Sequence, residues 1–447
     1  MNLRDFILGR EKLIGAIIII AVLAHMIFGK SRWQYYLIYL LAFLSVTLML
    51  YVSFPSVNIS RNLYRFFSIS FIILSLTSIV FLLALPMEKL PKPRGKYLIG
   101  TKIYDLIDDS RSEIYSQNLN ESRKIKIQVW YPADKVDGYK KAKWIGDGTI
   151  LTRHLAKNMH MPFFMLDHTS LIDSNSYKDA PLSDHLDSYP LVLISHGWLG
   201  FRELHTDFGE ELASNGYIGV SIDHTYGSQA VKFKDGSVAY LNPQALSGRG
   251  SSANFSNSSK RLVKTFGEDV ISVINEMEDL NKYDRDFKSK LDLNRIGLLG
   301  HSTGGGGDVY VSLKDPRVKA LLGLDAWVEP IEKLLLNKSL SIPSLFLRSS
   351  QWERGPNNRP LNALVEKSQD STLIQIDKAT HVDFSMAYMY SPLTKLVGFT
   401  GRLEGRQASE IQRDLILSFF DENLKERERS IIEIIDSYEN ARKIHTK

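Results

Sequence analysis

Residues 299–307 read LGHSTGGGG and place one serine, Ser302, shortly before four consecutive glycines. Four glycines in a row lose conformational entropy on folding and bury almost no side-chain surface. Their presence therefore indicates that the backbone must pack closely against other parts of the chain, where side chains would not fit. Residues 300–304 fit the pattern G-x-S-x-G, in which the serine occupies a strained turn between a strand and a helix. The run RIGLLG at 295–300 predicts that strand. The stretch therefore predicts a nucleophilic serine above a sheet, with glycines that let strand, helix and serine meet closely.

On both sides of this stretch, short apolar runs alternate with amphipathic segments. Strands are predicted at 124–132, 190–197, 217–223, 295–300, 317–325, 343–350 and 371–377, and helices at 203–216 and 262–280. This alternation predicts an α/β fold, in which a mostly parallel sheet carries helices on both faces. The segment at 247–261 is rich in Ser, Gly and Asn and predicts a loop. Active sites of such sheets lie at the carboxyl ends of the strands.

A serine hydroxyl becomes a good nucleophile only when a base takes its proton. Around G-x-S-x-G elbows the partners follow in the order serine, acid, histidine. Of eleven histidines, only His381 and His445 come after Ser302. His445 lies on a charged tail near the carboxyl terminus, whereas His381 follows the last predicted strand. We therefore expect His381 to be the base.

The acid has two candidates. Asp325 ends the strand at 317–325, and Glu353 follows the strand at 343–350, so either carboxylate could hold the imidazole in its correct tautomer. An oxyanion hole needs two backbone N–H groups. One is expected from Thr303, the residue after the nucleophile, and the other from Trp198, in the loop after the strand at 190–197.

The first 88 residues predict a separate all-α transmembrane module. Apolar runs without charged residues cover 13–28, 33–54 and 66–85. A bilayer core of about 30 Å needs about 20 helical residues, which the second and third runs supply. The first run is shorter and could be the core of a signal peptide, but no small-x-small cleavage pattern follows it. Residues 89–96, with two prolines, form a linker, and 97–447 form the catalytic domain.

The cations that flank the apolar runs do not indicate which ends of the helices face the cytoplasm. Five cations would lie on one side of the membrane and six on the other: Arg4, Arg10, Lys12, Arg61 and Arg65 against Lys30, Arg32, Lys89, Lys92, Arg94 and Lys96.

Composition excludes several chemistries. The chain has no cysteine, so disulfides, thiol nucleophiles and thiolate metal sites are absent. The net charge of +5 over 447 residues suggests no nucleic-acid partner. The expected chemistry needs no metal or organic cofactor, and the oligomeric state is left without a prediction.

The soluble part resembles the secreted platelet-activating-factor acetylhydrolases, the group VII phospholipase A2 enzymes, over roughly residues 97–400. The resemblance rests on PLVLISHGWLGFRELHTDFGEELASNGYIGVSIDH at 190–224, GHSTGG at 300–305, LGLDAWVEPI at 322–331 and ATHVDF at 379–384. In that family the elbow reads G-H-S-F-G-G and the acid lies in an L-D-A-W segment. A membrane module is not part of the family pattern.

This resemblance implies an α/β-hydrolase fold with Ser302 as nucleophile, Asp325 as acid and His381 as base. It also implies Trp198 and Thr303 as oxyanion donors. Thr303 stands where the family has phenylalanine and Trp198 where it has leucine; both changes keep the backbone donors but alter the pocket. The elbow is also similar to that of bacterial cutinases and polyester hydrolases, in which the acid follows the later strand. That second resemblance implies Glu353 instead.

We therefore expect a membrane-anchored serine ester hydrolase acting on short or oxidised acyl esters, such as those of phospholipids. Its partners would be an ester substrate and the lipid bilayer. A multi-pass protein of the cell membrane is expected, and the resemblance to secreted enzymes favours an extracytoplasmic catalytic domain. Two alternatives remain: a non-catalytic membrane sensor whose hydrolase-like domain only binds a ligand, and a transferase that passes the acyl group to an acceptor other than water.

Overall fold

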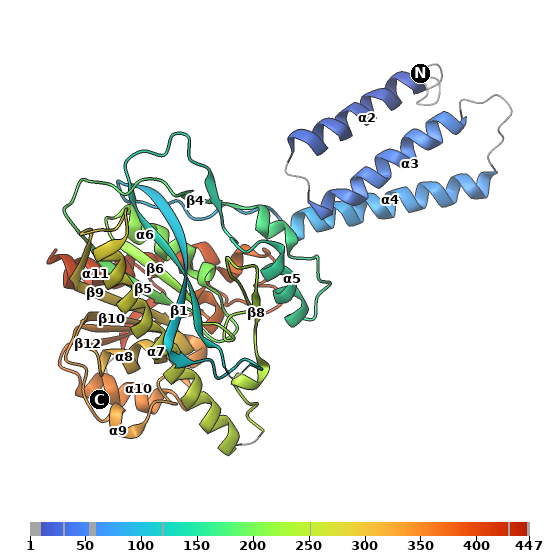
Figure 1. Ribbon diagram of the computed structural model, residues 1–447. Coiled ribbons are helices and arrows are strands. Elements are labelled where there is room, and N and C mark those ends of the chain that lie inside the picture. Colours follow the sequence, from blue (N-terminus) through green and yellow to red (C-terminus); the bar gives the residue numbers. More distant parts are fainter. Residues whose placement is uncertain are drawn as a thin grey trace.

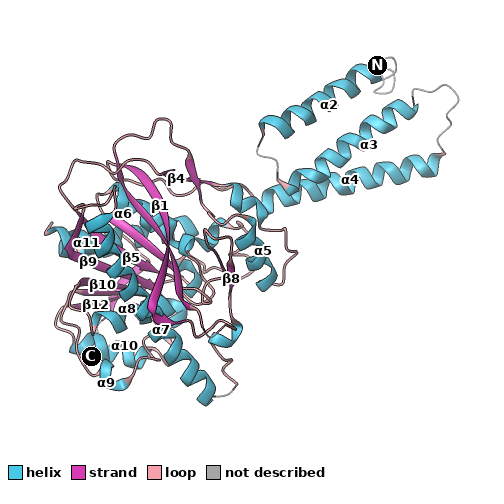
Figure 2. Ribbon diagram, viewed as in Figure 1, coloured by secondary structure: helices cyan, strands magenta, loops and turns pink. Residues whose placement is uncertain are grey.

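The computed structural model describes residues 10–29, 32–52, 60–118, 120–250, 252–427 and 430–444. An eleven-stranded sheet runs through the larger part of the molecule, in the order β13-β12-β11-β10-β9-β5-β6-β2-β1-β4-β3 (Figures 1 and 2). Its strands are β1 (Leu98–Ser112), β2 (Ser122–Ala133), β3 (Lys141–Lys143), β4 (Asp173–Lys178), β5 (Tyr189–Ser195), β6 (Ile218–Asp223), β9 (Leu291–His301), β10 (Val318–Leu324), β11 (Ser344–Ser349), β12 (Ser371–Ile376) and β13 (Ala441–Ile444). β7 (Ala230–Lys232) and β8 (Val238–Tyr240) form a separate two-stranded sheet.

The centre of the sheet is parallel. Neighbouring strands from β6 through β5, β9, β10 and β11 to β12 all run in one direction. Every residue of β5 is buried, as expected for a strand that helices cover on both faces. In register, Ser195 pairs with Gly300, and Leu324 pairs with both His301 and Leu347. The residues that follow these strands therefore gather at one edge.

Helices cover both faces, which confirms the predicted architecture. The longer helices of this part are α5 (Thr149–Asn158), α6 (Thr206–Ser214), α7 (Ser252–Tyr283), α8 (Thr303–Ser312), α10 (Asn358–Lys367) and α11 (Gly405–Lys425); the shorter ones are α9 (Lys333–Leu336) and α12 (Ile431–Asp436). Apolar residues of α7, α8 and α10 pack with one set of strand residues. Those of α6 and α11 pack with the alternate set, on the other face.

The predicted loop at 247–261 is largely wrong, because α7 already begins at Ser252. Tertiary contacts override the weak helix propensity of serine and asparagine here. Ser258 and Ser259 are buried, and Ser258 Oγ accepts a hydrogen bond from the Ser247 amide. The Phe255 ring packs against Trp327 with 5.9 Å between centroids.

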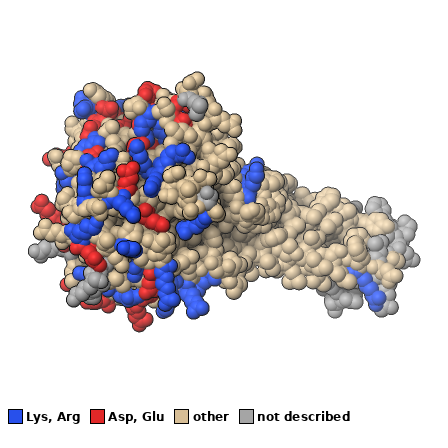
Figure 3. All heavy atoms as spheres, turned by 90° about the horizontal axis from the view of Figure 1, so that it is seen from below, with Lys and Arg blue, Asp and Glu red and all other residues tan. Residues whose placement is uncertain are grey.

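Three apolar helices project from this body as an arm: α2 (Glu11–Phe28), α3 (Tyr36–Val52) and α4 (Arg61–Ala84) (Figure 1). The stretches Trp33–Tyr51 and Arg65–Ala84 are long and apolar enough to cross a membrane, and Leu13–Phe28 is shorter. Residues 53 and 54 of the second predicted run lie outside the described residues. Figure 3 shows charged side chains spread over the body and few along the arm. Two apolar helices near the amino terminus thus fit either membrane spans or a signal sequence.

The segment of the predicted linker is bound to the body by ion pairs and hydrogen bonds. Arg406 on α11 pairs with Glu88, and Arg413 donates a hydrogen bond to the Lys92 carbonyl. Arg94 donates from Nε to Glu211 at 3.1 Å, and Leu90 is buried. The segment between α4 and β1 therefore follows α11.

Candidate active site

Ser302 lies in a tight turn between β9 and α8. Its backbone has φ 55° and ψ −118°, a conformation that costs a non-glycine residue about 1–3 kcal/mol. Three backbone hydrogen bonds of 2.9–3.0 Å hold the turn: the Ser302 amide donates to Leu324 O, and the amides of Trp327 and Gly306 donate to Ser302 O. The serine is 9% exposed. Strain at a turn with this much support is typical of a functional position.

The glycines of the elbow have no room for side chains. A Cβ on Gly300 would lie 2.3 Å from Asp308 Oδ2, and one on Gly304 would lie 2.5 Å from His196 O. A Cβ on Gly306 would lie 2.2 Å from Trp327 O. Each distance is far below van der Waals contact, so the run of glycines lets α8 start directly against the sheet.

The imidazole of His381 meets the carboxylate of Asp325. His381 begins the short 3-10 helix after β12, and its Nδ1 lies 2.9 Å from Asp325 Oδ2. Asp325 follows β10, is 1% exposed, and has a positive φ of 42°. Ser349, the last residue of β11, donates to this carboxylate from its amide at 2.8 Å and from its hydroxyl at 2.6 Å. The carboxylate is thus fixed by three donors from two neighbouring segments.

Glu353, the other candidate acid, lies elsewhere. Its side chain is 46% exposed and faces Arg442, with 3.8 Å between the charged atoms. The structure therefore brings Asp325, and not Glu353, to the imidazole.

Residues that sequence reasoning did not identify hold the ring of His381 in place. The Trp352 ring stacks on it almost in parallel, with 4.3 Å between centroids and 5° between planes. The His381 amide donates to Gln351 Oε1 at 2.7 Å, and His301 Nε2 donates to the His381 carbonyl at 3.0 Å. Trp352 and Gln351 come just after β11. This position, at the carboxyl edge of the sheet, was the one feature of the sequence that could have indicated their place near His381.

The two expected oxyanion donors have amides that are free to bind a ligand. Within the described chain, neither the Trp198 nor the Thr303 N–H donates a hydrogen bond to a protein acceptor. Thr303 is the first residue of α8, where helix amides have no intrahelical partner. A Cβ on Gly197 would lie 2.8 Å from Ser302 Cβ, so the peptide before Trp198 borders the nucleophile.

His196 orients this peptide, a role that the sequence did not reveal. Its Nδ1 donates to the Gly197 carbonyl at 2.7 Å, and its Nε2 accepts from the His224 amide at 3.3 Å. Burial lowers the pKa of His196 well below its usual range, so the ring is neutral. The Gly200 amide also donates to Gly197 O. In a trans peptide the C=O and the N–H point in opposite directions. The hydrogen bonds that Gly197 O accepts from His196 and Gly200 therefore turn the Trp198 N–H away from these two donors.

His301, the residue before Ser302, connects the nucleophile's turn to His381. The centroid of its ring is 4.6 Å from that of His381. In the part of the chain that the structure describes, no hydrogen bond links the Ser302 hydroxyl to the imidazole. Catalytic hydrogen bonds of ligand-free enzymes are often long and tighten when substrate binds.

Burial favours the neutral forms of two titratable groups beside the elbow, Asp308 and His301. Burial raises the pKa of Asp308, beneath Gly300, well above its usual range, and its carboxyl accepts from Ser195 Oγ at 2.9 Å. Burial also lowers the pKa of His301 well below its usual range.

Across the described residues, no three His, Asp or Glu side chains are grouped as metal ligands.

Comparison with known proteins gives the relatives of this chain. Residues 83–436 match the family described as platelet-activating factor acetylhydrolase, isoform II. The platelet-activating factor acetylhydrolase of Cavia porcellus is 24% identical over 353 residues, which cover 73% of this chain and 75% of the relative. A probable 1-alkyl-2-acetylglycerophosphocholine esterase of Arthroderma benhamiae is 24% identical over 288 residues, covering 60% of this chain and 66% of the relative.

The chain is also similar to two more distant proteins, one by sequence and one by fold. Cutinase 1 of Thermobifida cellulosilytica is 23% identical over 201 residues, 44% of this chain and 61% of that protein. The solved structure of a ferulic acid esterase from Streptomyces cinnamoneus aligns with a TM-score of 0.66 at 20% identity, covering 80% of this chain and all of the esterase. The family match spans more of the chain than the predicted 97–400 and includes the linker. The chain thus belongs to the platelet-activating factor acetylhydrolase isoform II family and is an ester hydrolase of the α/β-hydrolase fold.

Proposed function

We propose that the chain is a membrane-anchored serine ester hydrolase in which Ser302 is the nucleophile, His381 the base and Asp325 the acid. The observation that carries the proposal is the 2.9 Å contact of Asp325 with His381, at the sheet edge where the strained turn presents Ser302. Because Nδ1 donates to Asp325, the Nε2 lone pair remains available to accept the serine proton.

In the first half of the reaction, Ser302 Oγ attacks the ester carbonyl while His381 Nε2 accepts its proton. The tetrahedral oxyanion would bind the amides of Trp198 and Thr303. His381 then protonates the leaving alcohol, and an acyl-enzyme remains. In the second half, His381 accepts a proton from water, the resulting hydroxide attacks the acyl-enzyme, and the acid leaves as Ser302 regains its proton.

For the substrate we propose short or oxidised acyl esters of phospholipids. Membership of the family supports an ester of this kind. An apolar surface beside the arm supports a substrate held in lipid: Phe163, Leu396 and Val397 are 59%, 81% and 73% exposed. Monomeric soluble proteins rarely gather such side chains without a lipid or protein partner.

This surface, formed by the loops 161–165 and 391–399, adjoins the ends of the apolar helices. Trp33 Nε1, just before α3, donates to the Met165 carbonyl at 3.2 Å, and the Trp33 ring contacts Phe164 with 5.1 Å between centroids. The Ser391 hydroxyl donates to the Ala84 carbonyl at the end of α4. If the arm crosses a bilayer, both loops lie at its surface, which supports anchoring and lipid access together.

We further propose that the catalytic domain is extracytoplasmic in a multi-pass protein of the cell membrane. The resemblance to secreted enzymes supports this side. Protease added to intact cells should remove the body and leave the arm protected. Protection of the body until the cells are lysed would reverse the orientation, and release of the whole chain by salt or carbonate washing would refute anchoring.

The catalytic assignment is tested with the detergent-solubilised chain, short p-nitrophenyl esters and a fluorophosphonate probe. Ser302→Ala should abolish both turnover and labelling, and Ser110→Ala, at an exposed serine of β1, should retain both. Turnover by Ser302→Ala would refute the nucleophile. A wild-type chain that remains unlabelled would support the sensor alternative.

A further inference from the structure

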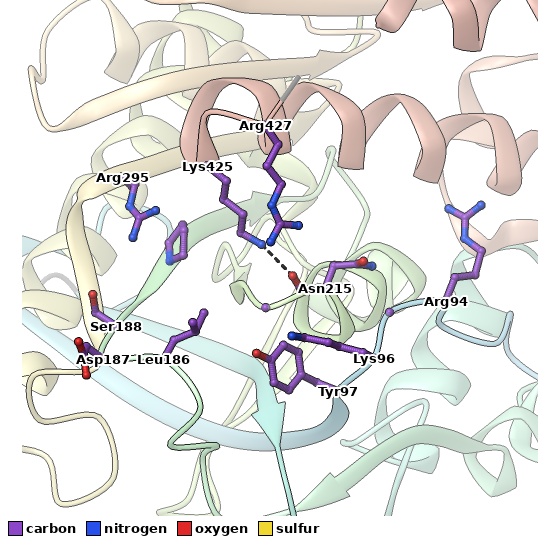
Figure 4. A pocket seen from close by; sticks show the side chains of 13 residues that line it. Arg94, Lys96, Tyr97, Leu186, Asp187, Ser188, Asn215, Arg295, Lys425 and Arg427 are labelled. Atoms are coloured by element: carbon purple, nitrogen blue, oxygen red, sulfur yellow. Dashed lines mark hydrogen bonds between the residues drawn. The ribbon is translucent and has the colours of Figure 1, made fainter. Parts of the chain in front are cut away.

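A cavity of about 650 Å³, drawn in Figure 4, opens at the amino edge of the sheet. Ser302 lies at the opposite, carboxyl edge. Ser188 and Gly216, which precede β5 and β6, both line the cavity, whereas Ser302 follows β9. Its size falls in the range of small-molecule sites. The ester hydrolysis proposed above does not use it.

The lining of this cavity is cationic. Five of the lining residues are Arg or Lys, and Asp187 is the single lining carboxylate; the cations are Arg94, Lys96, Arg295, Lys425 and Arg427. They converge from three parts of the chain: the linker, β9 and the end of α11. Figure 4 shows Lys425, at the end of α11, and Arg427, just after it, reaching toward Asn215, with Lys96 on the opposite wall.

Part of this charge is already neutralised. Arg94 pairs with Glu211 at 3.1 Å and also with Asp414, and Arg295 pairs with Asp292. These two arginines therefore contribute little net charge to the cavity.

The other three cations, Lys96, Lys425 and Arg427, are less fully paired with carboxylates. Lys425 and Arg427 share one buried carboxylate, Asp421, at the long distances of 3.7 and 3.9 Å. Lys96 has no ion pair among the described residues, and its ammonium lies 4.9 Å from the centroid of the Tyr97 ring.

Capping of α11 explains only some of these cations. Positive charge favours the carboxyl end of a helix, and Arg295 donates to the Leu424 carbonyl there. Lys96 comes from the linker, and α11 gives no reason for its place. Burial, opposed by the attraction of Asp421 and reinforced by repulsion from Arg427, lowers the pKa of Lys425 to about 7. An anion in the cavity would relieve this repulsion.

We propose that this cavity binds a small organic phosphate, with its phosphate among Lys96, Lys425 and Arg427. Arginine supplies a planar fork of donors that fits phosphate oxygens, and lysine adds a compact charge. The organic part would lie against the Tyr97 ring and Leu186, which also line the cavity. Since Arg94, Lys96 and Tyr97 belong to the segment leading from α4 to β1, the ligand would bridge that segment to the body.

The phosphate could belong to a soluble molecule or to a lipid headgroup, and the geometry favours the soluble source. α11 begins beside Glu88, near the end of α4, since Arg406 pairs with that residue at 2.6 Å. Lys425 ends the same helix, which at 1.5 Å per residue is about 31 Å long. The cavity therefore lies far along the body from the ends of the apolar helices.

The test measures binding of glycerol 3-phosphate and of inorganic phosphate to the full chain in detergent by calorimetry, at constant ionic strength. The wild-type chain should bind one equivalent of glycerol 3-phosphate, and more tightly than it binds inorganic phosphate. Lys96→Gln/Arg427→Gln removes two exposed cations of the cavity and should weaken binding about tenfold or more. The matched control Arg285→Gln/Lys288→Gln removes one exposed arginine and one exposed lysine outside the cavity and should bind as the wild type does.

Absence of saturable binding by the wild type, or equal weakening in both double variants, would overturn the proposal. A third measurement separates the sources: phosphatidic acid vesicles should not compete with glycerol 3-phosphate. Competition that the cavity variant abolishes would instead make the ligand a lipid headgroup and overturn the soluble assignment.

Discussion

His381 Nδ1 donates a 2.9 Å hydrogen bond to Asp325 Oδ2, although 56 positions separate the two residues in the chain. Parallel register makes this possible, because β10 and β12 flank β11 and end at the same edge. Ser349 on β11 donates twice to the same carboxylate, so the strand between them fixes the acid. Asp325 is thus held before any substrate arrives.

Loss of the Asp325 charge should disable the reaction without removing the side chain. In Asp325→Asn the amide no longer fixes the tautomer of His381 or stabilises its protonated form, and kcat should fall about 10³- to 10⁴-fold. Glu353→Gln is the matched control and should change kcat less than about threefold, because Glu353 faces Arg442. The measurement is steady-state hydrolysis of p-nitrophenyl acetate by the two variants. A larger loss of kcat in Glu353→Gln than in Asp325→Asn would make Glu353 the acid.

The role of His196 predicts a defect that a conservative replacement repairs. His196→Ala removes the Nδ1 donor to Gly197 O but leaves the Gly200 amide, so kcat should fall about tenfold with little change in KM. In His196→Asn the side-chain amide can donate in place of Nδ1, and much of kcat should return. Equal losses in the two variants, or a loss confined to KM, would argue against an effect on the oxyanion site.

Buried neutral histidines predict instability in acid. Burial lowers the pKa of His205 to about 4, while its Nε2 donates to Phe384 O. A histidine of the unfolded chain titrates near 6.5, so the unfolded state binds the extra proton as the pH falls. The stability from this group is complete above about pH 6.5 and is lost toward pH 4, a change of about 3 kcal/mol.

Thermal unfolding of the solubilised protein between pH 6.5 and pH 4 tests whether stability falls with pH as expected. His205→Gln keeps a donor for Phe384 O but cannot titrate, so its Tm should fall less steeply in acid than that of the wild type. His185→Gln, at an exposed histidine, should follow the wild type. A wild-type Tm that rises between pH 6.5 and 4 would contradict the expectation.

The apolar surface predicts a defect that is specific to lipid substrates. Leu396→Asp/Val397→Asp places two charges where we expect the bilayer surface and should lower hydrolysis of vesicle-bound esters about tenfold or more. Hydrolysis of soluble p-nitrophenyl acetate should stay unchanged. Leu334→Asp, at an 83% exposed leucine of α9, serves as the control and should affect neither rate.

The central strands could be predicted because their burial requires continuous aliphatic runs. β1 was missed, since its sequence LIGTKIYDLIDDSRS mixes charged residues into a strand that is largely not fully buried. Its pairing with β2 depends on a register that local sequence does not encode. The start of α7 was missed for a related reason: contacts of Phe255 and Ser258 with distant residues stabilise serine-rich turns that would not form a helix alone.

In the site, the order of residues along the chain was sufficient to propose Ser302 and His381. The choice between Asp325 and Glu353 was not available from spacing, because both follow strands at the same edge; their different surroundings appear only in three dimensions. The stacking of Trp352 on His381 and the bond from His196 to Gly197 depend on side-chain directions after a strand ends. No pattern of residue types specifies those directions.

The bound linker changes where a truncated, soluble form of the enzyme should begin. Removal of everything before residue 97 would uncover the apolar cluster around Phe201 and Met386 that Leu90 joins, and would leave Glu211, 2% exposed, without its Arg94 partner. A recombinant chain that starts near residue 86 would keep both contacts while discarding the apolar arm.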